Sequence, residues 1–364
     1  MAKAERERLA LILNSHLNTI HETLQVLDQT PPATVEKVKW EDVIKMGEQV
    51  SKQATIVGML WTGGTPKAKE VEENMASYFN VLQGFLLYFY GSTVGAGPTL
   101  SSNLHQSVMQ VVNSSFNLMK DSVSSSGSRS KDQKVAVPVL VGKVWEACSG
   151  LKKAPATNIA AIGRAMTQVA VSMKDVLREM RELKPDSGGQ EDDQQTSGGV
   201  AGDGDGNEDD DDDVGDMGND LSPEEMKVAE LAMEVVSDLL LVIKELIRSI
   251  TGLLKMEKAD TSGSFVDSLE KLLKSSQVIG AQIDELGACL YPPQEVSTME
   301  AALKKISSSL NGIESEVEDL KGSTDTFVKA CSGLRGSIKQ LELVLSCCSV
   351  GQLEEQLTNT SLSH

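Results

Sequence analysis

Aromatic residues are scarce in this chain of 364 residues: Phe, Trp and Tyr together make up only 4%. Proline is sparse as well, with 10 residues, while Leu, Ala, Met, Glu and Lys are common. Strands are enriched in aromatic and β-branched residues, whereas these common residues are good helix formers. The composition therefore favours helices over a β-sandwich, and the length allows two or three domains with substantial cores.

The cysteines do not form a disulfide framework. They are odd in number, two are adjacent, and no pair has the C-x-x-C spacing: Cys148, Cys289, Cys331, Cys347 and Cys348. Such a set is typical of a reducing compartment. Cys289 and Cys331 fall on apolar helix faces and are expected to be buried.

Long hydrophobic runs are also missing. The longest apolar stretch, Val81–Tyr90, is interrupted and far shorter than a membrane span. The N-terminus mixes charges of both signs and does not resemble a secretory signal. We expect a soluble intracellular protein without a membrane partner.

Basic residues are absent from one long segment. Between Asp186 and Asp220 the chain holds fourteen Asp and Glu residues and no Lys or Arg. This segment supplies fourteen of the nineteen net negative charges, so the rest of the chain is only mildly acidic. Because so polar a stretch cannot bury enough apolar surface to offset its ordering entropy, we predict a disordered acidic linker over 185–222.

The linker contains an unbroken acidic run with two interpretations. It is either a solvating spacer or a contact for a basic partner protein through charge complementarity. The residues of this candidate contact are Glu208, Asp209, Asp210, Asp211, Asp212 and Asp213. The acidic segment would repel phosphates, and the basic residues elsewhere are isolated, so we expect no direct nucleic-acid binding.

Outside the linker, apolar residues recur at alternating spacings of three and four, which places them on one face of a helix. In the C-terminal half, one series runs from Met226 to Leu254, a second from Phe265 to Leu290, and a third from Leu303 to Leu345. Gly322-Ser323-Thr324 is expected to break the third series into two helices. Four helices as long as these series, joined by short loops, are typical of an up-and-down bundle.

The N-terminal half shows the same periodicity and divides into about six helices. The breaks fall at Pro, at Gly or in polar stretches: Pro31-Pro32, Gly63-Gly64, 91–98, 124–134 and Pro155. No stretch has the alternation of a strand.

The fold class predicted is therefore all-α, with two helical bundles joined by the acidic linker. The expected divisions are an N-terminal bundle over 1–184, the linker 185–222, a C-terminal four-helix bundle over 223–348, and a flexible tail 349–364.

Short motifs that resemble functional sites each lack a required residue. His21-Glu22-Thr23-Leu24-Gln25 has Gln where the zinc-protease motif needs its second His. The stretch 203–214 opens like an EF-hand loop but lacks its central Gly and its final Glu. Gly95-Ala96-Gly97-Pro98 lacks the third Gly of a dinucleotide-binding loop. We predict no catalytic residue, metal site, cofactor or enzyme activity.

The apolar stripes also have two interpretations. They form the core of the bundles, or the segments 224–256 and 264–290 pair with a partner's helices as a helix-loop-helix without a basic region. The two interpretations compete, because a face buried in its own bundle meets a partner only if the bundle opens.

Several landmarks follow one another along the chain. They are Val144-Trp145-Glu146-Ala147-Cys148, the Ala/Ile/Met-rich helix after it, the acidic insert, and Leu290-Tyr291-Pro292-Pro293. In this arrangement the chain resembles the cyclin-D-binding protein family, helical adaptors that interact with D-type cyclins and the Grb2-related adaptor. The resemblance implies an all-helical, two-part protein of nucleus and cytoplasm. It also implies restraint of the cell cycle through cyclin D and antagonism of helix-loop-helix transcription factors.

The function predicted is a non-enzymatic regulatory adaptor that binds a D-type cyclin or a helix-loop-helix factor and restrains it by sequestration. One alternative is a cytoskeletal or adhesion-type helical-bundle scaffold. Another is an acidic chaperone for basic proteins that acts through Asp209 to Asp213 and binds in a salt-dependent way.

Overall fold

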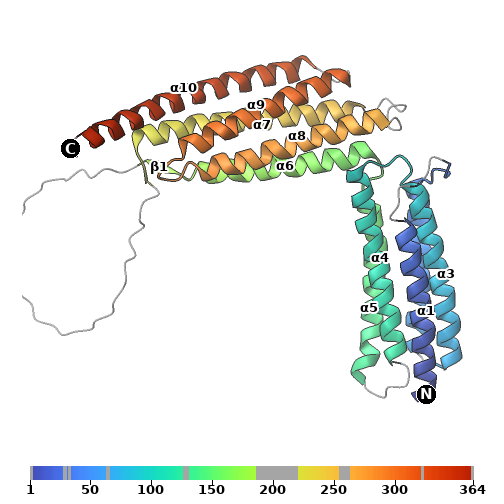
Figure 1. Ribbon diagram of the computed structural model, residues 1–364. Helices are drawn as coiled ribbons and strands as arrows, with labels where there is room; N and C mark the ends of the chain where they lie inside the picture. The colour runs from blue at the N-terminus through green and yellow to red at the C-terminus, as the bar shows by residue number, and fades with distance from the viewer. Residues whose placement is uncertain are drawn as a thin grey trace, which may run out of the picture. The chain divides into compact units, whose positions relative to one another are not determined.

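The computed structural model describes residues 3–27, 31, 34–62, 66–125, 131–185, 220–253, 263–320 and 324–361. These residues form ten α-helices, one short 3-10 helix and two strands of two residues each, which confirms the all-α class (Figure 1). In chain order the elements are α1 (Lys3–Leu27), α2 (Trp40–Thr62), α3 (Ala68–Ser92), α4 (Pro98–Ser125), α5 (Lys131–Gly150), η1 (Leu151–Lys153), α6 (Asn158–Met180), β1 (Lys184–Pro185), β2 (Asp220–Leu221), α7 (Pro223–Leu253), α8 (Gly263–Ala288), α9 (Val296–Asp319) and α10 (Asp325–Ser361).

The chain divides into two compact units, each built of helices. Unit 1 comprises Met1–Arg164 and Met256–Glu270, and unit 2 comprises Ala165–Lys255 and Lys271–His364. This division differs from the predicted boundary at residue 184, because most of α6 is grouped with the C-terminal helices. A helix can be assigned from its own periodicity, but the helices that it packs against depend on distant residues.

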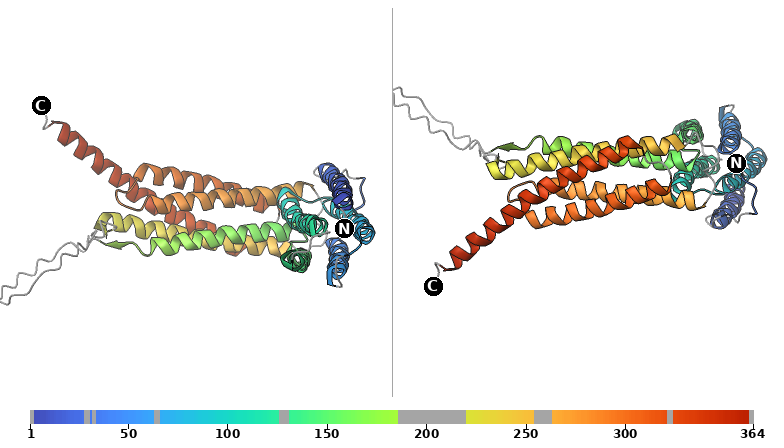
Figure 2. Two further views of the ribbon diagram at one scale, coloured as in Figure 1. Left: turned by 90° about the horizontal axis from the view of Figure 1, so that it is seen from below. Right: turned by 90° about the horizontal axis from the view of Figure 1, so that it is seen from above.

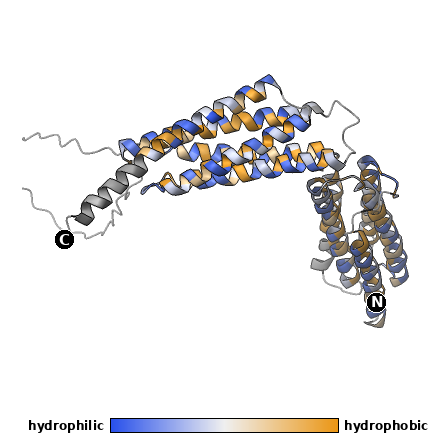
Figure 3. Cartoon of the chain, turned by 45° about the horizontal axis from the view of Figure 1, so that its top comes forward, coloured by the Kyte–Doolittle hydropathy of each residue, from blue (hydrophilic) through white to orange (hydrophobic). Residues whose placement is uncertain are grey.

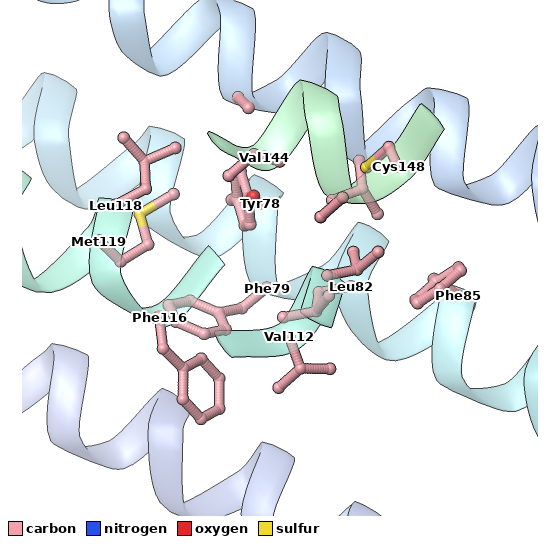
Figure 4. Packing of buried hydrophobic residues seen from close by; sticks show 14 of the residues in the cluster. Tyr78, Phe79, Leu82, Phe85, Val112, Phe116, Leu118, Met119, Val144 and Cys148 are labelled. Atoms are coloured by element: carbon pink, nitrogen blue, oxygen red, sulfur yellow. The ribbon is translucent and has the colours of Figure 1, made fainter. Parts of the chain in front are cut away.

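In unit 1, α1 packs on α3 and α4, α2 packs on α3 and α5, and α4 packs on α5. Aromatic and aliphatic side chains from α3, α4 and α5 fill the space between these helices (Figure 4). Tyr78 is fully buried there, and its hydroxyl donates to Ser115 Oγ at 2.8 Å. Ser115 in turn donates to the Val111 carbonyl at 2.7 Å. The buried phenol therefore has its hydrogen bond, as a polar atom in a core requires.

Unit 2 consists of long helices that run lengthwise beside one another (Figure 2). Hydrophobic and hydrophilic residues are interspersed along these helices (Figure 3). Two polar contacts show that α7 and α10 are antiparallel. Ser337 Oγ donates to Asp238 at 2.5 Å, and Thr326 Oγ1 donates to the buried Glu245 at 3.0 Å. The predicted break between the last two helices is confirmed, since α9 ends at Asp319 and α10 begins at Asp325.

Both flanks of the predicted linker belong to unit 2. Strands β1 and β2 pair in parallel, with Lys184 opposite Asp220 and Pro185 opposite Leu221. Residues 186–219, which include the acidic run, lie outside the described residues. At the other end of the chain α10 extends through Ser361, past residue 348, where the flexible tail was predicted to begin.

Candidate interaction surfaces

The glycine-rich turn before α4 is a structural element of unit 1. The backbone N–H of Gly97 donates to Asn158 Oδ1 at 2.7 Å, and Asn158 Nδ2 donates to the Gly95 carbonyl at 2.9 Å. A Cβ on Gly97 would lie 2.6 Å from a methyl group of Val266, so the site accepts no side chain. Because the N–H of Gly97 is already used, this turn offers no free cradle for a phosphate.

The histidines also pack as structural residues. His21, from the motif that resembles a zinc protease, stacks on Phe116 with ring centroids 6.1 Å apart. His16 stacks on Phe79 at 5.0 Å with the rings nearly parallel. Within the described ranges, no three His, Cys, Asp or Glu side chains are grouped so that they could hold a metal ion. Both the EF-hand-like stretch and the candidate contact Glu208–Asp213 lie outside those ranges.

Three of the cysteines are buried: Cys148, Cys289 and Cys331. This confirms the expectation for Cys289 and Cys331. Burial raises the pKa of the Cys148 thiol to about 12, and burial together with Glu314 raises that of Cys331 to about 12. Since the thiolate is the nucleophile, these two thiols are poorly suited to nucleophilic chemistry near neutral pH.

The apolar faces of α7 and α8 form the interior of unit 2. Val235, Leu239 and Val242 of α7 are fully buried, and so are Leu272 and Ile279 of α8. The interpretation of these stripes as bundle core is confirmed. A partner helix could reach them only if the bundle opened.

Helices α2 and α5 of unit 1 carry four exposed hydrophobic residues, which we call the α2–α5 face. They are Ile56, Met59, Val139 and Trp145, which are 42%, 65%, 55% and 46% exposed. Isolated exposed hydrophobic residues are common on proteins, but four on one pair of adjacent helices, including a tryptophan, mark a candidate binding surface.

The position of Trp145 follows from the register of α5. The core stripe of this helix takes Val141, Val144 and Cys148, and Trp145 falls one position to its side, next to α2. The two helices approach closely, because Gly58 of α2 has no side chain: a Cβ there would lie 3.0 Å from Val141. Because α2 and α5 are so close, the indole of Trp145 lies against the surface of α2.

The polar atom of Trp145 is already bonded. Its indole Nε1 donates to Thr55 Oγ1 at 3.1 Å, and Thr55 Oγ1 donates to the Ser51 carbonyl at 2.9 Å. The ring is therefore held against α2 while its apolar surface remains half exposed. Just beyond the end of α5, Lys152 of η1 forms an ion pair with Glu48 of α2, with Nζ and Oε1 3.0 Å apart. An apolar centre with a polar margin is the usual build of a protein-binding surface.

Sequence reasoning used Trp145 only as a landmark and did not identify it as exposed. The signal was available in the spacing: Val137, Val141, Val144, Cys148 and Leu151 form an unbroken stripe of threes and fours that omits position 145. A large aromatic residue beside such a stripe, rather than on it, is the pattern to look for.

Taken together, two helical units, polar clusters that serve the fold and a half-exposed tryptophan surface define a helical protein of the protein-binding class. Comparison with known proteins agrees with this class. Residues 42–186 match the family described as Grap2 and cyclin-D-interacting, N-terminal, and residues 207–315 match its C-terminal counterpart. The chain belongs to the Grap2 and cyclin-D-interacting family.

A curated relative comes from Xenopus laevis. Cyclin-D1-binding protein 1 homolog is 23% identical over 276 residues, which cover 75% of this chain and 78% of that protein. The α2–α5 face lies wholly inside the matched N-terminal family region. None of the described helices is long and apolar enough to cross a membrane.

Proposed function

We propose that this chain is a non-enzymatic regulatory adaptor that binds a D-type cyclin and restrains it by sequestration. Support comes from the family, whose members are described as interacting with cyclin D, and from the α2–α5 face. The observation that carries the proposal is Trp145, half exposed on a rigid helix pair with its N–H already bonded.

The physical basis is the behaviour of aromatic side chains at interfaces. A tryptophan buries a large apolar area at small cost in conformational entropy, and such residues dominate the binding free energy of many interfaces. Trp145 is held in place before binding by Thr55. Little further ordering is needed when a partner covers it.

A helix-loop-helix factor is the second partner in the proposal. With the stripes of α7 and α8 buried, such a factor would use an exposed face of the chain instead of exchanging helices with them. Two adjacent helices such as α2 and α5 offer a surface on which an amphipathic helix can pack.

We also propose that Glu208–Asp213 contact basic segments of partner proteins, and that the protein acts in nucleus and cytoplasm. Contact through exposed carboxylates is screened by salt, so this part of the binding falls steeply with ionic strength. Binding through Trp145 is apolar and depends much less on salt.

The test is titration of the full chain with a purified D-type cyclin and, separately, with a helix-loop-helix domain. Trp145→Ala is expected to weaken binding at least about tenfold, because interface tryptophans typically contribute more than about 1.4 kcal/mol. Leu87→Ala is the matched control, since Leu87 is 58% exposed on α3 of the same unit, outside the face. It should change the affinity less than about twofold.

One result would contradict the proposed function, and another would contradict only the binding surface. If the unmodified chain binds neither protein, the adaptor function fails. If it binds and Trp145→Ala binds equally well, the function stands and the α2–α5 face is the wrong surface. Trp40 and Trp61 remain as fluorescent reporters that the variant is folded.

A further inference from the structure

Helices α6 and α8 pack closely in unit 2. Val169 lies against Gly280 and Val176 against Gly287, where a Cβ on the glycine would come within 3.1 Å and 2.8 Å of a valine methyl group. In both contacts the glycine lies 111 residues after the valine in the chain. Moving seven residues along α6 therefore means moving seven residues along α8 in the same direction, so the two helices are parallel. Next to the second contact the helices leave a cleft of about 290 Å³.

The floor of the cleft is apolar. Val176 and the buried Met180 line it from α6, and Gly287 lines it from α8. The absent side chain of Gly287 lets Val176 lie close against the backbone of α8. Tyr291, 43% exposed, lines the cleft just after the end of α8.

The backbone beside Tyr291 is fixed. The preceding Leu290 is fully buried, and Gln294 donates to the Leu290 carbonyl at 3.2 Å and to the Glu225 carbonyl at 3.0 Å. The tyrosine ring is thus attached to a well-held turn, available for contact with a guest. An exposed aromatic ring next to carboxylates is a favourable site for a cation.

Two carboxylates lie on the rim, Glu179 from α6 and Asp284 from α8. Neither has a hydrogen-bond or ion-pair partner among the described residues, unlike Asp175 one turn earlier, which pairs with Arg178 at 3.3 Å. Each residue of α6 lies level with the residue of α8 that is 111 positions later in the chain. Glu179 is therefore level with position 290, six residues beyond Asp284. At about 1.5 Å per residue this is a separation of about 9 Å along the cleft.

We propose that this cleft binds an amphipathic basic helix of a partner protein. Two Arg or Lys residues seven positions apart on one face of a helix are about 10 Å apart, close to the spacing of the two carboxylates. An apolar residue between them, at the third or fourth position, then lies over Val176, Met180 and Gly287. Tyr291 contacts one of the cationic groups through its ring.

The charge around the cleft favours the same guest. β1 begins four residues after Met180, and its pairing with β2 holds both flanks of segment 186–219 together. That segment is not part of the site, but by sequence it carries thirteen carboxylates, which attract basic chains to this end of unit 2. The site is separate from the α2–α5 face and does not depend on the function proposed for it.

The test is fluorescence anisotropy with the full chain and a labelled helical peptide of about 18 residues. The peptide carries Arg at one position and seven positions later, with Leu at the third and fourth positions between them. Saturable binding is expected. Replacing Glu179→Gln together with Asp284→Asn should weaken it about fivefold, because exposed ion pairs contribute modestly and add when they are apart.

The matched control is Glu182→Gln with Glu285→Gln. Both side chains are exposed and near the same helix ends, but neither lines the cleft, and the change in charge is identical. A second variant, Ala288→Leu, fills the cleft without changing any charge and should also weaken binding several-fold. Replacing Asp209–Asp213 by Asn should weaken binding at low salt and leave the difference between cleft variant and control unchanged.

The proposal is overturned if the peptide does not bind the unmodified chain. It is also overturned if the control pair weakens binding as much as the cleft pair, or if Ala288→Leu has no effect, because attraction would then be a general property of an acidic chain. Trp145→Ala should leave peptide binding unchanged, which separates a failure of this site from a failure of the α2–α5 face.

Discussion

Glu270 caps the N-terminus of α4 through Thr99. Its Oε1 accepts a hydrogen bond from the Thr99 backbone N–H at 2.9 Å, and its Oε2 accepts one from the Thr99 hydroxyl at 2.7 Å. That N–H is among the donors that have no partner within the helix. A carboxylate there is also favoured by the partial positive charge at the helix start. Glu270 belongs to unit 1 although it is 171 residues further along the chain.

Removing this cap should destabilise unit 1. We expect Glu270→Ala to lower the free energy of unfolding by about 1–2 kcal/mol, the range for a lost helix cap. All three tryptophans of the chain, Trp40, Trp61 and Trp145, lie in unit 1, so urea denaturation followed by tryptophan fluorescence reports on that unit. Glu22→Ala, at an exposed position on α1, is the control and should cost less than about 0.5 kcal/mol. Equal losses in the two variants would rule out the cap.

Two glycine substitutions should act in opposite directions in unit 2. Gly287→Ala would place a methyl group 2.8 Å from Val176, so the helices must shift, and we expect a loss of about 1–3 kcal/mol. Gly336→Ala in α10 meets no atom within 4 Å and should add about 0.5–1 kcal/mol, because alanine loses less backbone entropy in a helix. Melting followed by far-UV circular dichroism measures both. Shifts of the same sign would show that α6 and α8 are not in tight contact at Gly287.

Local sequence patterns predict the helices well because each helix carries its own signal. The series from Met226 to Leu254 corresponds to α7, and the series from Phe265 to Leu290 corresponds to α8 within a few residues. The start of α7 is also local: Ser222 Oγ accepts from the Glu225 N–H at 3.2 Å, while Glu225 accepts from the Ser222 N–H at 3.0 Å. This reciprocal pair is a capping box, which sequence alone can reveal.

Features that depend on distant residues could not be predicted in this way. Strands β1 and β2 have two residues each, too few to show alternation, and pair across the segment 186–219. The grouping of α6 with unit 2 depends on its fit to Gly280 and Gly287 of α8.

The polar loop predicted over 124–134 is too long, since α4 runs to Ser125 and α5 begins at Lys131. Helix α5 contains Pro138, which pattern rules place near helix starts.

The cysteines should differ sharply in their reactivity. With a pKa of about 12, the thiols of Cys148 and Cys331 are ionised to about one part in ten thousand near pH 8. Cys347 is exposed, so we expect iodoacetamide to modify it far sooner than those two. Mass spectrometry of peptides after timed alkylation measures the order, and the urea-unfolded chain is the control in which all react. Rapid modification of Cys148 in the folded protein would contradict its burial.

Acidification should weaken unit 1 through His16. Burial lowers the pKa of this side chain below its usual 6.5, and its ring stacks on Phe79. As the pH falls below 6.5, the unfolded chain takes up a proton that the folded state binds only at lower pH. The stability associated with neutral His16 is therefore complete above pH 6.5 and is lost as the pH falls through the folded pKa.

The substitution that tests this is His16→Phe, which keeps a ring on Phe79 and removes the titrating group. The midpoint of urea unfolding, followed by tryptophan fluorescence, should fall less in this variant than in the unmodified chain between about pH 7 and pH 5. Near pH 7.5, where His16 is neutral in both folded and unfolded chains, the difference between the two proteins reflects packing alone. Parallel pH profiles for the two proteins would show that His16 does not contribute, and that the packing of α1 on α3 is independent of its charge.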